Sequence, residues 1–292
     1  MKRKLAFALA LVLLVGCMFV GCGKASPSTT PDADTSDVSS ARKVLRVAME
    51  CAYAPYNWTQ SSDANGAVLI KDSNSYAYGY DVMMAKKIAE ALDMDLEIYK
   101  QDWDSLVPAV MAGTVDCVIA GQSITSDRLQ SVDFSEPYYY ASIVTLVRAD
   151  SKFSNAASVA DLSGATCTSQ LNTVWYDTCL PQIPDAKIQP AQESAGNAIV
   201  AVSAGRVDLM VTDEPTALAA CAANPDLKML NFSGTDGDFN VSEEEINIGI
   251  SLQKGNDELK DAINGVLSTM TVDDYTAMMQ EAIKVQPLSE VE

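Results

Sequence analysis

The chain contains no histidine among its 292 residues. This absence excludes catalytic triads and general bases built on imidazole, and it removes the commonest protein ligand of transition metals. Aromatic residues are also scarce, at 7% of the chain. Reaction chemistry would have to rest on carboxylates, hydroxyls, amines or thiols, and nothing in the composition indicates a cofactor.

Positive charge is in short supply. Lysine and arginine together number 20 against 39 aspartates and glutamates, which gives a net charge of −19. Such an acidic surface argues against nucleic acid and against an anionic membrane surface as direct partners. The simplest interpretation of the excess acid is solubility outside the cell.

Cysteines are few and do not form CxxC pairs, so we expect no zinc or other metal site. Two lie close to the N-terminus, and five follow in the body of the chain: Cys51, Cys117, Cys167, Cys179 and Cys221. An odd number outside the cell leaves at least one free thiol. The pairings Cys51 with Cys117 and Cys167 with Cys179 both remain open.

The N-terminus carries a targeting signal. The basic start Met1–Lys4 precedes an apolar run, Leu5–Val15, which is too short for an ordinary membrane span and typical of a secretory signal. Small residues precede both Cys17 and Cys22, as in bacterial lipoproteins, where the cysteine is acylated. We favour Cys22, with Cys17 as the alternative, because a polar segment begins directly after Cys22. Residues 1–21 are then a lipoprotein signal peptide.

Residues 22–43 are rich in Ser, Thr, Pro and Asp, which predicts a disordered tether. From Val44 the pattern alternates between short apolar strands and amphipathic helices. The clearest helix is residues 81–92, in which apolar side chains recur at the spacing of one helical face. Strand and helix in alternation predict an α/β fold with covering helices.

A short internal repeat indicates two similar halves. Residues 109–116 recur at 201–208, with six of eight positions identical. The same spacing places Gly121 in register with Asp213, and each follows an apolar strand. The carboxyl ends of strands line the ligand crevice in open α/β sheets. We therefore expect the loop that begins at Gly121 and the side chain of Asp213 on opposite walls of one cleft.

Residues 120–140 are the most informative stretch. A glycine, a run of hydroxyls that includes Ser123, and Arg128 follow an apolar strand, and an aromatic cluster closes the segment. Backbone amides and hydroxyls beside a guanidinium form a receptor for a carboxylate, because arginine binds carboxylates through two parallel hydrogen bonds.

Four segments together resemble one family, the extracellular solute-binding proteins of family 3 that serve ABC transporters for polar amino acids. They are residues 45–56, 79–82, 123–138 and 205–215. The resemblance covers residues 44–285. It implies a two-lobed, type II periplasmic-binding-protein-like α/β fold. Each lobe is a mostly parallel sheet with covering helices, and a hinged cleft separates them.

The resemblance also implies the connectivity. Lobe one comprises residues 44–148 plus 248–292, and lobe two comprises residues 149–247, with crossings near Arg148 and near Asn247–Gly249. Residues 256–285 look helical and return to lobe one. The stretch Thr59–Ala77 is longer and more polar than the family's simple turn, and we expect a disordered loop there, with an extended hairpin over the rim of the cleft as the alternative.

Residue by residue, the resemblance assigns Arg128 and Ser123 to the ligand α-carboxylate and Asp213 to the α-ammonium. Tyr53 and Trp103 would form aromatic walls around the ligand side chain. Each assignment has a structural alternative: a surface ion pair for Arg128, a helix cap for Asp213, and ordinary core packing for the two aromatic residues.

The remaining candidates come from the same loops. Glu50 would face a polar or cationic end of the ligand or the ammonium, and Gly121 would offer backbone to the cleft. Gln122 points either into the cleft or into solvent. Thr173 matches the start of the second ligand loop, although Asn172–Val174 departs from the family's Gly-Thr-Thr and leaves the carboxylate geometry open.

The predicted function is capture of a free amino acid outside the cytoplasm and delivery to a membrane permease, by a monomer held at the membrane through a lipid anchor. Two alternatives are a dehydratase-like enzyme on the same fold, with Glu50 or Glu214 as acid, and a stand-alone ligand sensor. The sequence does not distinguish among polar amino acids, nor an open from a closed resting state.

Mass spectrometry of the membrane fraction tests the anchor. We expect an N-terminal peptide that begins at acylated Cys22, because the polar tether starts there. A Cys22→Ser variant should release the protein from membranes, whereas Cys17→Ser should not. Acylation found at Cys17 would reverse the assignment.

Overall fold

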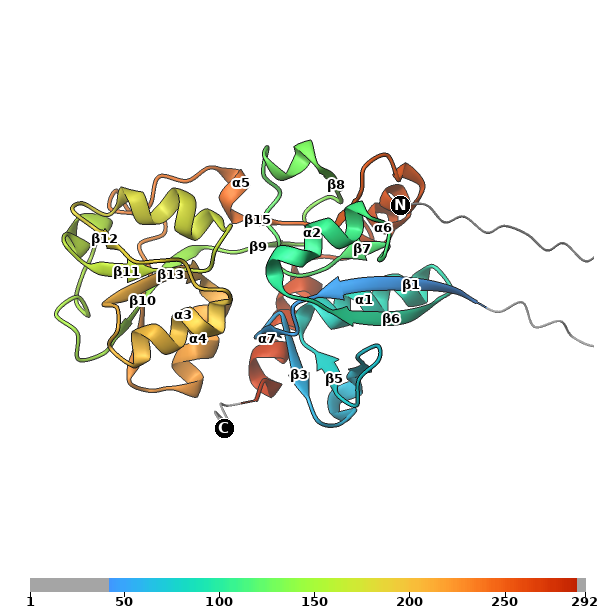
Figure 1. The fold of residues 1–292 in the computed structure, drawn as a ribbon, viewed down its shortest axis with the longest axis horizontal. Coiled ribbons are helices and arrows are strands. Elements are labelled where there is room, and N and C mark those ends of the chain that lie inside the picture. The colour runs from blue at the N-terminus through green and yellow to red at the C-terminus, as the bar shows by residue number, and fades with distance from the viewer. Residues whose placement is uncertain (1–41, 288–292) are drawn as a thin grey trace, which may run out of the picture. The chain divides into compact units, whose positions relative to one another are not determined.

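The computed structural model describes residues 42–287, so the predicted signal peptide, both acylation candidates and nearly all of the tether lie outside the described residues. Two five-stranded sheets organise the described chain (Figure 1). The first sheet has the order β6 (Met94–Lys100), β1 (Lys43–Met49), β7 (Cys117–Val118), β16 (Ser251–Gln253) and β8 (Val132–Phe134). The second has the order β12 (Lys187–Ile188), β11 (Thr166–Thr168), β13 (Leu209–Asp213), β10 (Ile143–Arg148) and β14 (Leu227–Leu230).

The predicted α/β architecture of mostly parallel sheets is confirmed, because four of the five strands in each sheet run in one direction. In the first sheet β1 runs parallel to β6 and β7, whereas β16 runs antiparallel to β7 and β8. In the second, β11 runs parallel to β12 and β13, and β10 runs antiparallel to β13 and β14. The antiparallel members, β16 and β10, are the strands with which the chain enters a sheet after crossing from the other one.

The two crossing segments pair with each other. Strands β9 (Tyr139–Tyr140) and β15 (Asn247–Ile248) form a two-stranded antiparallel ribbon between the sheets (Figure 1). The second crossing segment is β15, at Asn247–Ile248. The first lies before Ile143 rather than near Arg148, because β10 already pairs within the second sheet.

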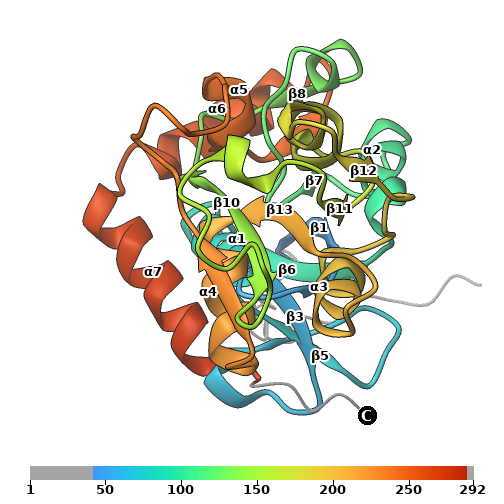
Figure 2. The ribbon, with the colours of Figure 1, turned by 90° about the vertical axis from the view of Figure 1, so that its left-hand side faces the viewer.

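Helices cover both sheets. They are α1 (Tyr80–Ala91), α2 (Trp103–Met111), α3 (Ala195–Ser203), α4 (Glu214–Ala223), α5 (Glu243–Ile246), α6 (Asp257–Leu267) and α7 (Val272–Val285). The apolar face predicted for residues 81–92 is buried in α1 at Ala85, Ile88 and Ala89. The long helical tail is two helices, and its second member α7 contacts α4, as Figure 2 shows.

The internal repeat is a helix–glycine–strand unit. Helix α2 is followed by Gly113 and then β7, and α3 is followed by Gly205 and then β13. Both glycines have left-handed backbone, with φ of 69° and 67°. This conformation costs glycine little, so the repeated glycine ends each helix and turns the chain into the following strand.

The disordered loop expected at Thr59–Ala77 is wrong. A four-stranded sheet forms there, in the order β2 (Ala52–Tyr53), β3 (Asn57–Gln60), β5 (Tyr76–Tyr78) and β4 (Val68–Leu69). Lys71 forms a 2.7 Å ion pair with Glu97 of β6, and Trp58 packs edge-on against Tyr78. The polar residues of this stretch lie mainly in the turns, whereas Ile70, Ala77 and Tyr78 are buried in the core, so the average composition concealed the strands.

The five cysteines in the body of the chain are free thiols, so neither candidate disulfide is formed in this structure. Four are buried, and only Cys221 is partly exposed. Burial raises the pKa of the Cys51 and Cys179 thiols to about 12, so both are protonated at neutral pH.

Gly79, immediately before α1, gives a test of the local packing. A Cβ at Gly79 would lie 2.3 Å from the Tyr56 carbonyl oxygen, whereas a Cβ at Gly113 would meet nothing within 4 Å. We expect Gly79→Ala to lower the free energy of unfolding by about 3 kcal/mol and Gly113→Ala by about 1 kcal/mol, measured by denaturant titration. Equal losses would contradict the close approach.

Candidate functional site

Arg128 lies at the start of a short 3-10 turn, residues 128–130, in the loop that follows β7. Its guanidinium donates to the carbonyl oxygens of Ser123, at 2.8 Å, and Asn172, at 3.0 Å. It also lies 5.5 Å from the centre of the Trp103 ring. Loss of solvent lowers the pKa of Arg128 to about 10, so the side chain stays cationic at neutral pH.

Asp213 ends β13 and is 2% exposed. Its carboxylate accepts hydrogen bonds from the backbone N–H and the hydroxyl of Thr216, each at 2.9 Å, and from the hydroxyl of Tyr53. The N–H bond makes Asp213 the N-cap of α4, so the capping alternative is part of its role. Burial raises the pKa of Asp213, and its hydrogen bonds act against that shift.

Neither of these two charged groups takes part in an ion pair among the described residues. Arg128 binds only backbone carbonyls through its guanidinium, and Asp213 binds only hydroxyls and an N–H. The surface ion pair considered for Arg128 is therefore not formed. A buried or half-buried charge without a counter-charge is unfavourable, so each group has an unmet electrostatic requirement.

Glu50 lies at the end of β1 and is 6% exposed. It accepts a hydrogen bond at 3.3 Å from Gln170, which lies in the loop after β11. Burial raises the pKa of Glu50 to about 7. With Trp103, Lys100 and Glu193 it lines a cavity of about 520 Å³. The side chain is therefore placed at a polar cavity and titrates near neutrality.

The loop that begins at Gly121 is held in place by its contacts with Tyr53 and with Ser251 of β16. Gly121 has φ of 64°, and a Cβ there would lie 2.7 Å from the Tyr53 ring. Gln122 is 2% exposed, and its side-chain oxygen accepts from the Ser251 hydroxyl at 2.8 Å. It also lines a small cavity of about 150 Å³ that Trp103 and Arg128 share. Gln122 thus points inward, held by β16.

Thr173 is buried, and its hydroxyl donates to the Gln170 carbonyl at 2.7 Å within its own loop. Ser123 contributes its carbonyl to Arg128. The structure therefore brings Arg128, Trp103 and Gln122 together around one cavity, and Tyr53 together with Asp213. It uses the Thr173 hydroxyl to shape the second loop.

Several site residues were missed by sequence reasoning. Gln170 bonds to Glu50, Thr216 bonds to Asp213, and Tyr56 stacks on Tyr53 with ring centres 4.8 Å apart. Asn172 binds both Arg128 and Asp104. Only Asn172 carried a signal, as the departure from Gly-Thr-Thr. Gln170 becomes recognisable only once it lies beside Glu50, a partner far away in the sequence, whereas Thr216 and Tyr56 are local neighbours of Asp213 and Tyr53.

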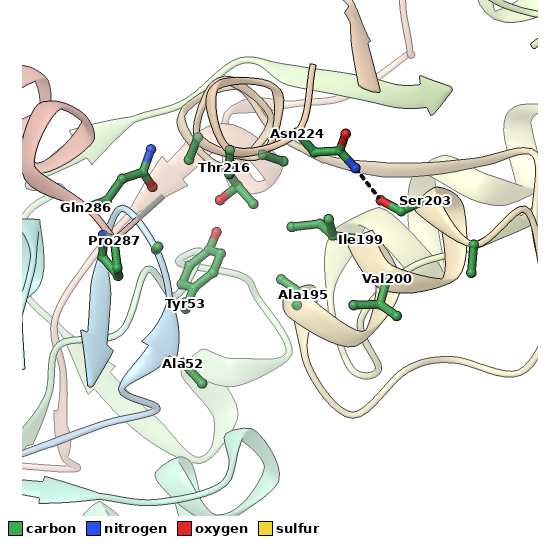
Figure 3. Close-up of a pocket in the computed structure, with 16 residues that line it drawn as sticks. Ala52, Tyr53, Ala195, Ile199, Val200, Ser203, Thr216, Asn224, Gln286 and Pro287 are labelled. Carbon is green, nitrogen blue, oxygen red and sulfur yellow. Dashed lines mark hydrogen bonds between the residues drawn. The ribbon is translucent and has the colours of Figure 1, made fainter. Parts of the chain in front are cut away.

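A further cavity of about 540 Å³ lies on the other side of Tyr53, between α3 and α4 (Figure 3). Seven of its sixteen lining residues are alanine, and Ile199 and Val200 from α3 add larger apolar side chains. Asn224 donates to Ser203 across it at 3.2 Å. Arg128 and Asp213 do not line it, whereas Tyr53 and Thr216, which hydrogen-bond to Asp213, do.

Residues 42–287 contain no group of three or more Cys, Asp or Glu side chains arranged to hold a metal ion. No helix within the same residues is both long and apolar enough to cross a membrane.

Comparison with known proteins identifies the class. Residues 45–284 match the family model of the bacterial extracellular solute-binding proteins, family 3, and the chain belongs to that family. A probable histidine-binding protein of Campylobacter jejuni is 28% identical over 261 residues, which is 86% of this chain and 91% of that protein. A putative ABC transporter arginine-binding protein of Escherichia coli is 28% identical over 80% of this chain and 88% of its own length.

Among solved structures, the chain is similar to an amino acid ABC transporter substrate-binding protein from Streptococcus pneumoniae bound to L-arginine. The TM-score is 0.71 and the identity 27%, over 82% of this chain and 94% of that one. The predicted family and two-lobed fold are therefore confirmed. Membership of this extracellular family places the protein outside the cytoplasm.

The raised pKa of Glu50 predicts how the free energy of unfolding changes with pH, and that change tests whether the side chain is buried. Because the fold favours the protonated side chain, its ionisation destabilises the protein as pH rises from about 4.5, the ordinary value, through 7. We expect Glu50→Gln to exceed the parent protein in unfolding free energy by on the order of 2 kcal/mol at pH 8 and to match it near pH 4.

Denaturant titrations at the two pH values give the measurement. Glu193→Gln is the control, since Glu193 lines the same cavity but is exposed. A stability difference for Glu50→Gln that does not change with pH would contradict the assignment.

Proposed function

We propose that the protein captures a free polar amino acid outside the cytoplasm and delivers it to the membrane permease of an ABC transporter. The observation that carries this proposal is the pair of unmatched charges, the cationic Arg128 and the buried Asp213. A zwitterionic amino acid supplies the missing carboxylate and the missing ammonium in one molecule. The names of the relatives point the same way.

The roles of the first groups follow from this pairing. Arg128 binds the ligand carboxylate through its two N–H edges, with Ser123 and the Gly121 backbone beside it. The Asp213 carboxylate accepts hydrogen bonds from the ligand ammonium. The ammonium replaces the Tyr53 hydroxyl, which donates to this carboxylate in the structure. The protein's own groups therefore hold the positions that the ligand takes over, and Tyr53 then serves as a wall.

The side-chain end of the ligand faces Glu50 and the Trp103 ring at the 520 Å³ cavity. An ionised Glu50 matches a cationic or hydrogen-bond-donating side chain. Binding of a cation there would also stabilise the ionised form of Glu50 at neutral pH. Arginine, histidine and lysine are the amino acids that fit this end best.

Capture requires the two sheet units to close on the ligand. We assign lobe one to the first sheet with α1, α2, α6 and α7, and lobe two to the chain between the β9 and β15 crossings. The short β9–β15 ribbon is the hinge, because only two strands connect the lobes there. A monomer anchored through acylated Cys22 would present the closed lobes to the permease.

An enzyme on this fold is the alternative that the sequence raised. The two sequence relatives compared above are named for amino acid binding, and the arginine-bound neighbour is named a substrate-binding protein. Glu214 is the first residue of α4 and lies beside the capped Asp213, where it supports the helix terminus. Binding without covalent chemistry accounts for the site, and we favour it.

Arg128→Ala tests the carboxylate assignment. Calorimetric titration with the amino acid that binds the parent protein should show at least about 100-fold weaker binding, because the charge-assisted bonds to the carboxylate are lost. Arg206→Ala, at an exposed position in the helix–glycine–strand turn, is the control and should keep the parent affinity. Retained affinity in Arg128→Ala would remove the proposed clamp.

A further inference from the structure

A buried polar chain connects the two ligand-facing loops of lobe one. The loop with Tyr53 runs from Cys51 to Asn57, and the second loop starts at Gly121. The backbone N–H of Cys51 donates to the Asn57 side chain at 2.6 Å, and Asn57 donates in turn to Asp81 at 2.7 Å. The other oxygen of Asp81 accepts from the Tyr138 hydroxyl at 2.7 Å.

This buried series of hydrogen bonds ends at the loop that starts at Gly121. The backbone N–H of Gly121 donates to the same Tyr138 hydroxyl at 3.1 Å. A phenol offers one proton and accepts others, so the Tyr138 hydroxyl satisfies Asp81 and Gly121 at once. Asp81 and Asn57 are fully buried, and Tyr138 is 1% exposed. No water competes with these bonds at such depth, and each is costly to leave unmade.

The start of α1 adds rigidity to this arrangement. The N–H groups of Tyr80 and Asp81 donate to the carbonyls of Pro55 and Tyr56, at 3.1 and 2.8 Å. Asp81 therefore touches the Tyr53 loop through its backbone and through Asn57, and it touches the Gly121 loop through Tyr138. One carboxylate at a helix terminus is common to both loops.

We propose that Asp81 and Tyr138 are positioning residues that set the spacing between Tyr53 and the Gly121–Arg128 loop, and so determine ligand affinity without touching the ligand. The proposal rests on the proposed function for its effect on affinity. Its structural part does not depend on that function. It requires that removing one hydrogen-bonding group from the buried network speeds hydrogen exchange at the Gly121 amide.

Tyr138→Phe is the sharpest variant, with Tyr80→Phe as its match. The two rings stack with centres 5.8 Å apart, and each hydroxyl donates one buried hydrogen bond, Tyr80 to the Tyr138 carbonyl at 2.7 Å. Both variants lose a hydroxyl from the same ring pair. Only Tyr138→Phe removes the acceptor of the Gly121 N–H.

Native-state hydrogen exchange of the Gly121 amide, followed by NMR on glycine-labelled protein, measures the loosening. We expect exchange to rise at least about tenfold in Tyr138→Phe and to stay within about threefold of the parent in Tyr80→Phe. Affinity for the bound amino acid should fall by about tenfold in Tyr138→Phe alone. Asp81→Asn is the second variant and should speed exchange at Cys51, Gly121 or both.

The possible results distinguish a failure of the positioning role from a failure of the proposed function. Unchanged Gly121 exchange in Tyr138→Phe, or an equal rise in Tyr80→Phe, overturns the proposal. Faster exchange with unchanged affinity also overturns it, because the chain would then be structural only. If the parent protein bound no amino acid while Gly121 exchange rose as predicted, the proposed function would fail and the positioning role would stand.

Discussion

The unmatched charges of Arg128 and Asp213 are the constraint to which the rest of the site responds. Each is held away from solvent by neutral partners, namely backbone carbonyls for the guanidinium, and hydroxyls and an N–H for the carboxylate. These partners make the charges tolerable without neutralising them. A ligand with a carboxylate and an ammonium gains from both, and a ligand with only one of these groups leaves the other charge unmatched. In the proposed function, selectivity for amino acids follows from this single requirement.

The same reasoning explains why the protein's own groups fill the site. The Tyr53 hydroxyl donates a hydrogen bond to Asp213, and the Asn172 carbonyl accepts one from Arg128. Each bond gives a charged group a neutral partner from the other half of the chain. Glu50 and Gln170 form a further bond of this kind. Ligand affinity is therefore a difference between two sets of bonds, those made to the ligand and those given up by the protein. The polar links between lobes are part of that balance.

Much of this architecture could be predicted from the sequence. The helix–glycine–strand repeat at residues 109–116 and 201–208 indicated two similar halves, because the left-handed glycine and the following strand are local features. Gly121 and Asp213 were predicted to face one crevice for the same reason, since each follows an apolar strand.

The features that could not be predicted depend on distant pairing. The short strands of the four-stranded sheet are separated by polar turns, and Ile70 beside them pairs with Ile98 of β6. Gln170 acquires a role only beside Glu50, and the membership of β10 in the second sheet depends on β13 and β14. A pattern along one segment carries no information about such partners.

Thermal unfolding of the refolded, ligand-free protein with each of the twenty amino acids, cystine and ornithine is the most direct test of the central claim. Binding to the folded state alone raises the midpoint in step with ligand concentration, by about 2.7 kcal/mol of stability at 100 times Kd. The account predicts a rise with at least one polar amino acid, and none with analogues of it that lack the carboxylate or the amino group. Well-folded protein whose midpoint is unchanged by every amino acid would contradict it.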